Sequence, residues 1–151
     1  MRIWRSILRL RVLAALPALA LATPTLAAPP PGVTVQHAWV RYLLPNIPAG
    51  GYLTLTNTSD YTAVLTGASS PACGSLMLHE SMNMGGAAMM MAVQSVPVPA
   101  HGSLVLTEGG YHLMCMSPEM KIGGKAPITL QFQDGSLILV QAPVYGPAGA
   151  P

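Results

Sequence analysis

Short runs of apolar and β-branched residues, separated by turn-forming residues at roughly ten-residue intervals, constrain the fold of this chain most. After residue 32, no long segment repeats its apolar residues with the period of a helix. The pair Asp134-Gly135, between two such runs, predicts a tight hairpin. The predicted fold is therefore all-β, an antiparallel Greek-key β-sandwich. The expected strands cover residues 33–40, 51–57, 63–69, 76–79, 89–94, 104–107, 111–116, 128–132 and 137–144.

Residues 1–27 have the pattern of a secretory signal peptide. Four arginines precede a short apolar run that cannot cross a bilayer, and Ala27 and Ala28 offer a small-residue cleavage site. No cysteine stands at that site, so we expect an exported, soluble protein without a lipid anchor. The β-sandwich domain is expected over residues 28–145, and residues 146–151 are expected to form a disordered tail.

Removal of the signal peptide changes the charge of the chain. The whole sequence has a formal net charge of +2, but residues 28–151 hold three Lys or Arg against five Asp or Glu, a net charge of −2. No basic patch remains to bind RNA or DNA, so nucleic acid is excluded as a partner. The motifs of P-loop enzymes, serine hydrolases and His-Glu-x-x-His metalloenzymes do not occur, so we expect no enzyme activity.

Four residues with metal-binding side chains stand at a distinctive spacing: His79, Met90, His112 and Met114. Two imidazoles and two thioethers form a donor set without carboxylate or thiolate, and thioether sulfur favours Cu(I). Strand alternation points His112 and Met114 to one face of their strand, opposite the apolar residues. The same alternation points His79 away from the core. The four residues therefore predict a Cu(I) site at one edge of the sandwich.

Six further methionines leave alternatives open. Met77 and Met116 point to the same faces as the predicted ligands, so they are candidates for auxiliary ligands or for replacements of a primary one. Four others flank Gly85-Gly86, a predicted turn that would deliver Met90 from the following strand. They have two interpretations, as flexible side chains that fill gaps in the core or as a rim that docks a partner or passes copper. These four are Met82, Met84, Met89 and Met91.

The two cysteines, Cys73 and Cys115, also have more than one interpretation. In an exported protein a disulfide persists, and here it would join the strand of His79 to the strand of His112 and Met114. We favour this bridge over two buried free thiols. A copper thiolate is less favoured because alternation points Cys115 inward.

With this spacing of histidines and methionines, the chain resembles the periplasmic copper chaperone family PCu(A)C, whose signature is His-x10-Met-x21-His-x-Met. The segments Ala38–Arg41, Gly51–Asn57 and Glu108–Met114 are also similar to that family, and the likeness covers about residues 33–145. The resemblance implies a cupredoxin-like β-sandwich, expected to be monomeric, that binds one Cu(I). It implies the ligands His79, Met90, His112 and Met114.

The resemblance also implies a function in the periplasm. Family members deliver copper toward the Cu(A) centre of cytochrome c oxidase, so the expected partner is subunit II of that oxidase or a Sco-type protein. Two other functions stay open. One is copper sequestration or resistance with the same site, and the other is a secreted β-sandwich interaction module whose methionines only pack.

Overall fold

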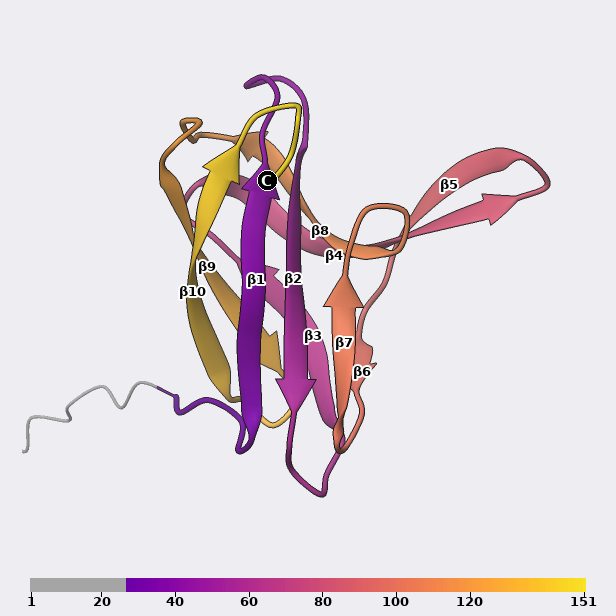
Figure 1. Ribbon diagram of the computed structural model, residues 1–151, viewed down its shortest axis with the longest axis vertical. Helices are drawn as coiled ribbons and strands as arrows, with labels where there is room; N and C mark the ends of the chain where they lie inside the picture. Colours follow the sequence, from indigo (N-terminus) through magenta and orange to yellow (C-terminus); the bar gives the residue numbers. More distant parts are fainter. Residues whose placement is uncertain (1–26) are drawn as a thin grey trace, which may run out of the picture.

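The computed structural model describes residues 27–151 and builds them from ten strands, with no helix in that range (Figure 1). The predicted all-β class is confirmed, whereas nearly all of the predicted signal peptide lies outside the described residues. No helix in the described part of the chain is long and apolar enough to cross a membrane. The strands are β1 (Val33–Arg41), β2 (Ala49–Asn57), β3 (Ala63–Ser69), β4 (Cys73–Met84), β5 (Ala87–Ala92), β6 (Val96–Val98), β7 (Gly102–Leu106), β8 (Tyr111–Pro118), β9 (Lys125–Phe132) and β10 (Leu137–Tyr145).

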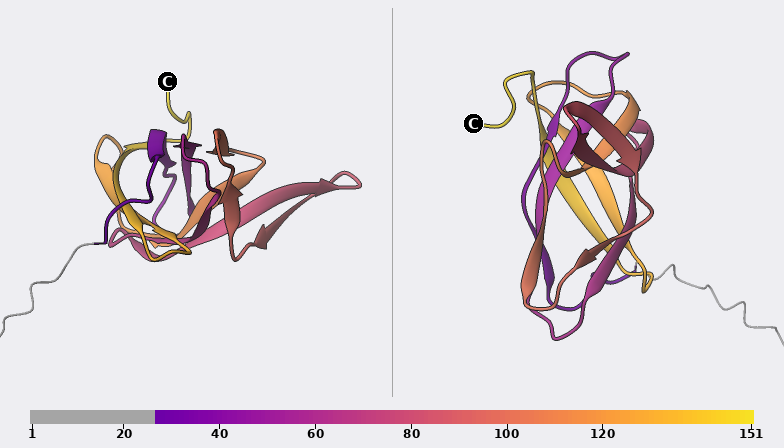
Figure 2. Two further views of the ribbon diagram at one scale, coloured as in Figure 1. Left: turned by 90° about the horizontal axis from the view of Figure 1, so that it is seen from below. Right: turned by 90° about the vertical axis from the view of Figure 1, so that its right-hand side faces the viewer.

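The strands join in one hydrogen-bonded sheet that curls around a core (Figures 1 and 2). Their order is β5-β4-β8-β2-β1-β10-β9-β3-β6, and β7 pairs with β2. Every pairing is antiparallel except that of β1 with β10, which is parallel at Val40 and Val144. Strands far apart in the sequence are neighbours, as expected for Greek-key connections. In particular, β8 lies between β4 and β2, which brings two of the predicted ligand strands side by side.

The core contains the inward-facing residues of each strand. Leu78 of β4 and Leu113 and Cys115 of β8 are buried, as alternation predicts. Because successive side chains of a strand point to opposite faces, their neighbours His79, His112 and Met114 point to the other face of the sheet. The core therefore fixes which face of β4 and β8 presents the candidate ligands.

Strand β6 is the one that the sequence does not predict. Pro97 stands at its centre and lacks the N–H that a ladder needs. The strand is last in the sheet order and pairs only with β3, so Pro97 lies at an edge, as expected. Pro127 lies opposite Gln141 of β10, and the pairing of β9 with β3 ends at Thr129. Its missing N–H therefore removes no hydrogen bond to β3.

The hairpin of β4 and β5 projects from the body of the molecule (Figures 1 and 2). Its turn is formed by Gly85 and Gly86, whose φ angles are 62° and 90°. Two successive positive φ angles are what a tight two-residue hairpin turn requires. The predicted turn is thus confirmed, and β5 follows it directly. β5 is an edge strand, and within residues 27–151 its only neighbour in the sheet is β4.

The C-terminal tail, residues 146–151, contains a turn, and its expected disorder stays a prediction. The N–H of Gly149 donates a hydrogen bond to the carbonyl oxygen of Gly146 at 3.0 Å, which closes a turn. Gly149 also lies against the indole ring of Trp39. The tail packs because a glycine without a Cβ can approach that ring closely.

Candidate metal centre

The register between β4 and β8 places candidate donors in two facing rows. His79 lies directly opposite His112, and Met77 lies directly opposite Met114. Side chains directly opposite each other in an antiparallel pair share one face of the sheet and touch. The two imidazole rings are stacked, with centroids 5.9 Å apart. A ring nitrogen binds a metal in the plane of its ring, about 3 Å from the centroid, so the two rings are close enough to share one ion once both turn a nitrogen toward it.

Met90 reaches the same face from the neighbouring strand. It lies opposite Ser81, and Ser81 points the same way as His79 because the two are separated by one residue. Met90 is therefore diagonal to His79, a separation that long side chains bridge. Its side chain is 60% exposed and lines one pocket together with His112 and Met114. The structure thus brings all four predicted ligands to one face of β5, β4 and β8.

The two histidines have different hydrogen-bond environments. His112 is only 6% exposed, and its Nδ1 lies 3.0 Å from the carbonyl oxygen of Gly110. The neutral ring donates its proton there, so Nε2 keeps a free lone pair for a metal. The Nδ1 atom of His79 is buried and has no hydrogen-bond partner. Because a buried polar atom without a partner costs free energy, a metal ion would supply what this nitrogen lacks.

A pocket of about 250 Å³ opens on this face. Met90, His112 and Met114 line it together with Leu43, Ile47 and Pro48, which belong to the loop of residues 42–48 between β1 and β2. Sequence reasoning missed this loop because it has neither strand alternation nor a metal-binding side chain. The pocket places the thioether and imidazole donors in largely apolar surroundings.

The charged residues beside the pocket are paired with each other. Arg41 forms an ion pair with Glu108, with Nη1 and Oε1 2.9 Å apart. Tyr52 also lines the pocket. Burial raises the pKa of its phenol above the ordinary value, and the nearby Arg41 acts in the opposite direction. Among the described residues that line the pocket, the metal-binding side chains are neutral and the cation Arg41 is paired, so it repels a metal ion less.

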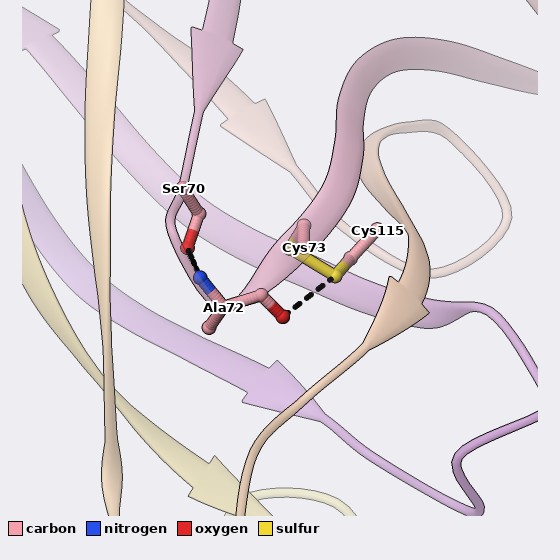
Figure 3. Close-up of a disulfide and its surroundings, with 4 residues drawn as sticks. All are labelled: Ser70, Ala72, Cys73 and Cys115. Atoms are coloured by element: carbon pink, nitrogen blue, oxygen red, sulfur yellow. Dashed lines mark hydrogen bonds between the residues drawn. A yellow bond between two sulfur atoms is a disulfide. The ribbon is translucent and has the colours of Figure 1, made fainter.

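The cysteines are joined in a disulfide, the alternative that the sequence favoured (Figure 3). The bridge links the start of β4 to β8, and Cys115 is buried next to Met114. The Sγ atom of Cys115 also lies 3.8 Å from the carbonyl oxygen of Ala72, but a disulfide sulfur has no proton, so this is a contact and not a hydrogen bond. Both sulfurs are used in the bridge, so neither is a copper thiolate.

The auxiliary candidates take different positions on this face. Met77 lies directly opposite Met114, next to the histidine pair, whereas Met116 lies one row farther away, opposite Ser75. Neither lines the pocket, and of the four predicted ligands His79 also lies outside its lining. In residues 27–151, no group of three or more His, Cys, Asp or Glu side chains is placed to hold a metal ion. The candidate centre is thus a combination of two imidazoles with methionine sulfur.

Comparison with known proteins identifies the family. Residues 33–144 match the family described as "LpqE-like: Putative lipoprotein LpqE-like". The chain belongs to this family. A relative from Leifsonia xyli subsp. xyli (strain CTCB07), "Putative lipoprotein Lxx21020", is 38% identical over 122 residues, which is 79% of this chain and 73% of the relative. Lipoproteins are exported, which agrees with the expected export. The expected lack of a lipid anchor differs from this description and stays a prediction.

Solved structures agree with the family and the fold. The solution structure of apo-DR1885 from Deinococcus radiodurans is 35% identical with a TM-score of 0.60, covering 91% of this chain and 95% of that one. The structure of CuI-DR1885 is 36% identical with a TM-score of 0.62, covering 78% and 80%. The copper-bound PCuAC domain from PmoF2, 21% identical with a TM-score of 0.63, covers 77% and 94% and shows the shared fold. The predicted resemblance to PCu(A)C proteins is thus confirmed.

Proposed function

We propose that this chain is a Cu(I)-binding metallochaperone that works outside the cytoplasm. His79, Met90, His112 and Met114 would hold one ion tightly. The observation that carries the proposal is the register of β4 with β8, which places the two imidazoles side by side, together with the buried nitrogen of His79 that has no partner. The relative DR1885, which is 36% identical to this chain, has a solved structure in its Cu(I) form.

The donor set explains the choice of metal. Cu(I) prefers soft thioether sulfur and accepts imidazole, whereas Mg²⁺ and Ca²⁺ require oxygen ligands. Methionine has no proton to lose, so only the two histidines must be neutral for Cu(I) to bind. Zn²⁺ should bind more weakly because the site lacks thiolate and carboxylate.

The position of the site favours transfer over storage. His112 is buried and lines the pocket, whereas Met90 is largely exposed on the edge strand β5. An acceptor protein can therefore approach Met90 first and replace the ligands in turn. We propose that copper passes toward the Cu(A) centre of cytochrome c oxidase, through subunit II or a Sco-type protein. Sequestration is the second candidate and would use the same ligands.

Competition with a chromogenic Cu(I) chelator tests the site, with ascorbate to keep copper reduced. The protein should withdraw one Cu(I) from the chelator, and the His112→Ala, Met114→Leu double variant should withdraw almost none. The matched control is Met120→Leu, because Met120 lies outside β4, β5 and β8. Unchanged affinity in the double variant would remove these residues from the site.

A gene deletion separates delivery from sequestration. If the protein delivers copper, the deleted strain should lose oxidase activity when copper is limiting, and added copper should restore it. Increased sensitivity to excess copper with normal oxidase activity would instead support sequestration.

A further inference from the structure

The projecting hairpin has a second face that the candidate centre does not use. In the register of β4 with β5, Met82 lies directly opposite Met89, Glu80 opposite Met91, and Met84 opposite Ala87. These residues alternate with Ser81 and Met90, so they point to the other face of the hairpin. We call the methionines of this face the hairpin cluster: Met82, Met84, Met89 and Met91.

The hairpin cluster does not fill gaps in the core. Met84, Met89 and Met91 are 60%, 46% and 47% exposed, and none of the four methionines packs against the buried core. The hairpin projects from the body (Figure 1), and β5 has only β4 beside it in the sheet. The packing interpretation of these side chains is therefore wrong, and their concentration on one face needs another explanation.

We propose that the hairpin cluster is a second Cu(I) site, made of thioethers alone and weaker than the first. The side chains of Met82 and Met89 face each other across the strands, and Met91 and Met84 are their diagonal neighbours. Directly opposite Cβ atoms are about 5 Å apart and diagonal positions about 7–8 Å, within reach of long side chains. Three flexible methionine sulfurs can therefore meet at one ion, and such soft donors select Cu(I).

The charge of the hairpin also suits a monovalent cation. Thioethers are neutral, so Cu(I) bound by them keeps its positive charge. Glu80 lies on the same face, directly opposite Met91, and residues 77–94 contain no Lys or Arg. The carboxylate of Glu80 can thus offset the charge of the bound ion. An exposed site of this kind would collect Cu(I) next to Met90, which lies between two cluster residues. This role rests on the proposed function, although binding by the cluster does not.

Titration of three forms of the protein with Cu(I) tests the proposal, with ¹³C-methyl NMR of methionine to locate each ion. The wild type should bind one ion tightly and a second more weakly, and the weaker one should shift the methyl signals of Met82, Met89 and Met91. Replacing all four cluster methionines by leucine nearly conserves volume and should remove only the weaker ion. The first ion is the internal control that this variant folds. Met120→Leu should keep both ions.

The His79→Ala, His112→Ala variant separates this proposal from the proposed function. It should lose the tight ion and keep the weaker one on the cluster. A single ion in the wild type, or two ions in the four-leucine variant, would overturn the second site. Two ions in the double-alanine variant would contradict the proposed function. The second site would then stand only if the weaker ion still shifts the methyl signals of Met82, Met89 and Met91.

Discussion

Removal of the disulfide should lower the stability of the protein strongly. The bridge joins Cys73 to Cys115, which are 42 residues apart in the sequence. In the chain-entropy description, a loop of this length raises the free energy of the unfolded state by about 4 kcal/mol. With an unfolding entropy of about 260 cal/mol/K for the folded residues, the midpoint temperature should fall by about 15 °C. Urea and thermal unfolding, followed by circular dichroism, measure both quantities for the oxidised protein and the Cys73→Ala, Cys115→Ala variant.

Reduced wild-type protein is the matched control, because it lacks the bridge but keeps both sulfur atoms in place. Its loss should equal most of the loss in the double-alanine variant, with the remainder from the small cavity at buried Cys115. Below its midpoint the reduced protein should still bind Cu(I), since the pairing of β4 with β8 also holds His79 opposite His112. A reduced protein within 1 kcal/mol of the oxidised one would refute this reasoning.

Two other features lead to predictions. The buried side chain of Asn57 donates hydrogen bonds to the carbonyl oxygens of Tyr61 and Val98, at 2.7 and 3.2 Å. Asn57→Ala should therefore cost about 2–3 kcal/mol of unfolding free energy in urea, while Asn46→Ala in the exposed loop should cost almost nothing. The raised pKa of Tyr52 means that the folded state holds the phenol proton more firmly than the unfolded state, whose pKa is near 10. Unfolding free energy should thus fall as pH rises above 10 and not below it, and Tyr52→Phe should abolish that part of the fall; an equal fall in both proteins would assign it to other groups.

Much of the fold follows from local sequence patterns, because alternation and turn residues act over short distances. The turn at Gly85-Gly86 and the inward position of Leu113 are examples that the structure confirms. Strand β6 is not predicted because Pro97 argues against a strand, although an edge tolerates it. The centre of β5 is also shifted from the predicted segment, since a run of methionines has no alternation that marks a strand boundary.

The candidate site, like the fold, is predicted from the sequence only where local alternation decides it. Alternation within β8 predicts that His112 and Met114 share a face. The contact between His79 and His112 depends on how β4 pairs with β8, and such long-range pairing is set by packing of the whole core. The loop of residues 42–48 carries no periodic signal, so its position over the donors is visible only in the structure. The hairpin cluster likewise becomes a face only when the register of Met82 with Met89 is known.

X-ray absorption spectroscopy at the copper edge tests most directly whether His79, Met90, His112 and Met114 bind one ion. Protein loaded with less than one equivalent of Cu(I) should show a shell that contains both nitrogen and sulfur. The His79→Ala, His112→Ala variant should lose the nitrogen and keep only sulfur, while Met120→Leu should match the wild type. An all-sulfur shell in the wild type, or an unchanged shell in the double variant, would contradict the assignment of these ligands.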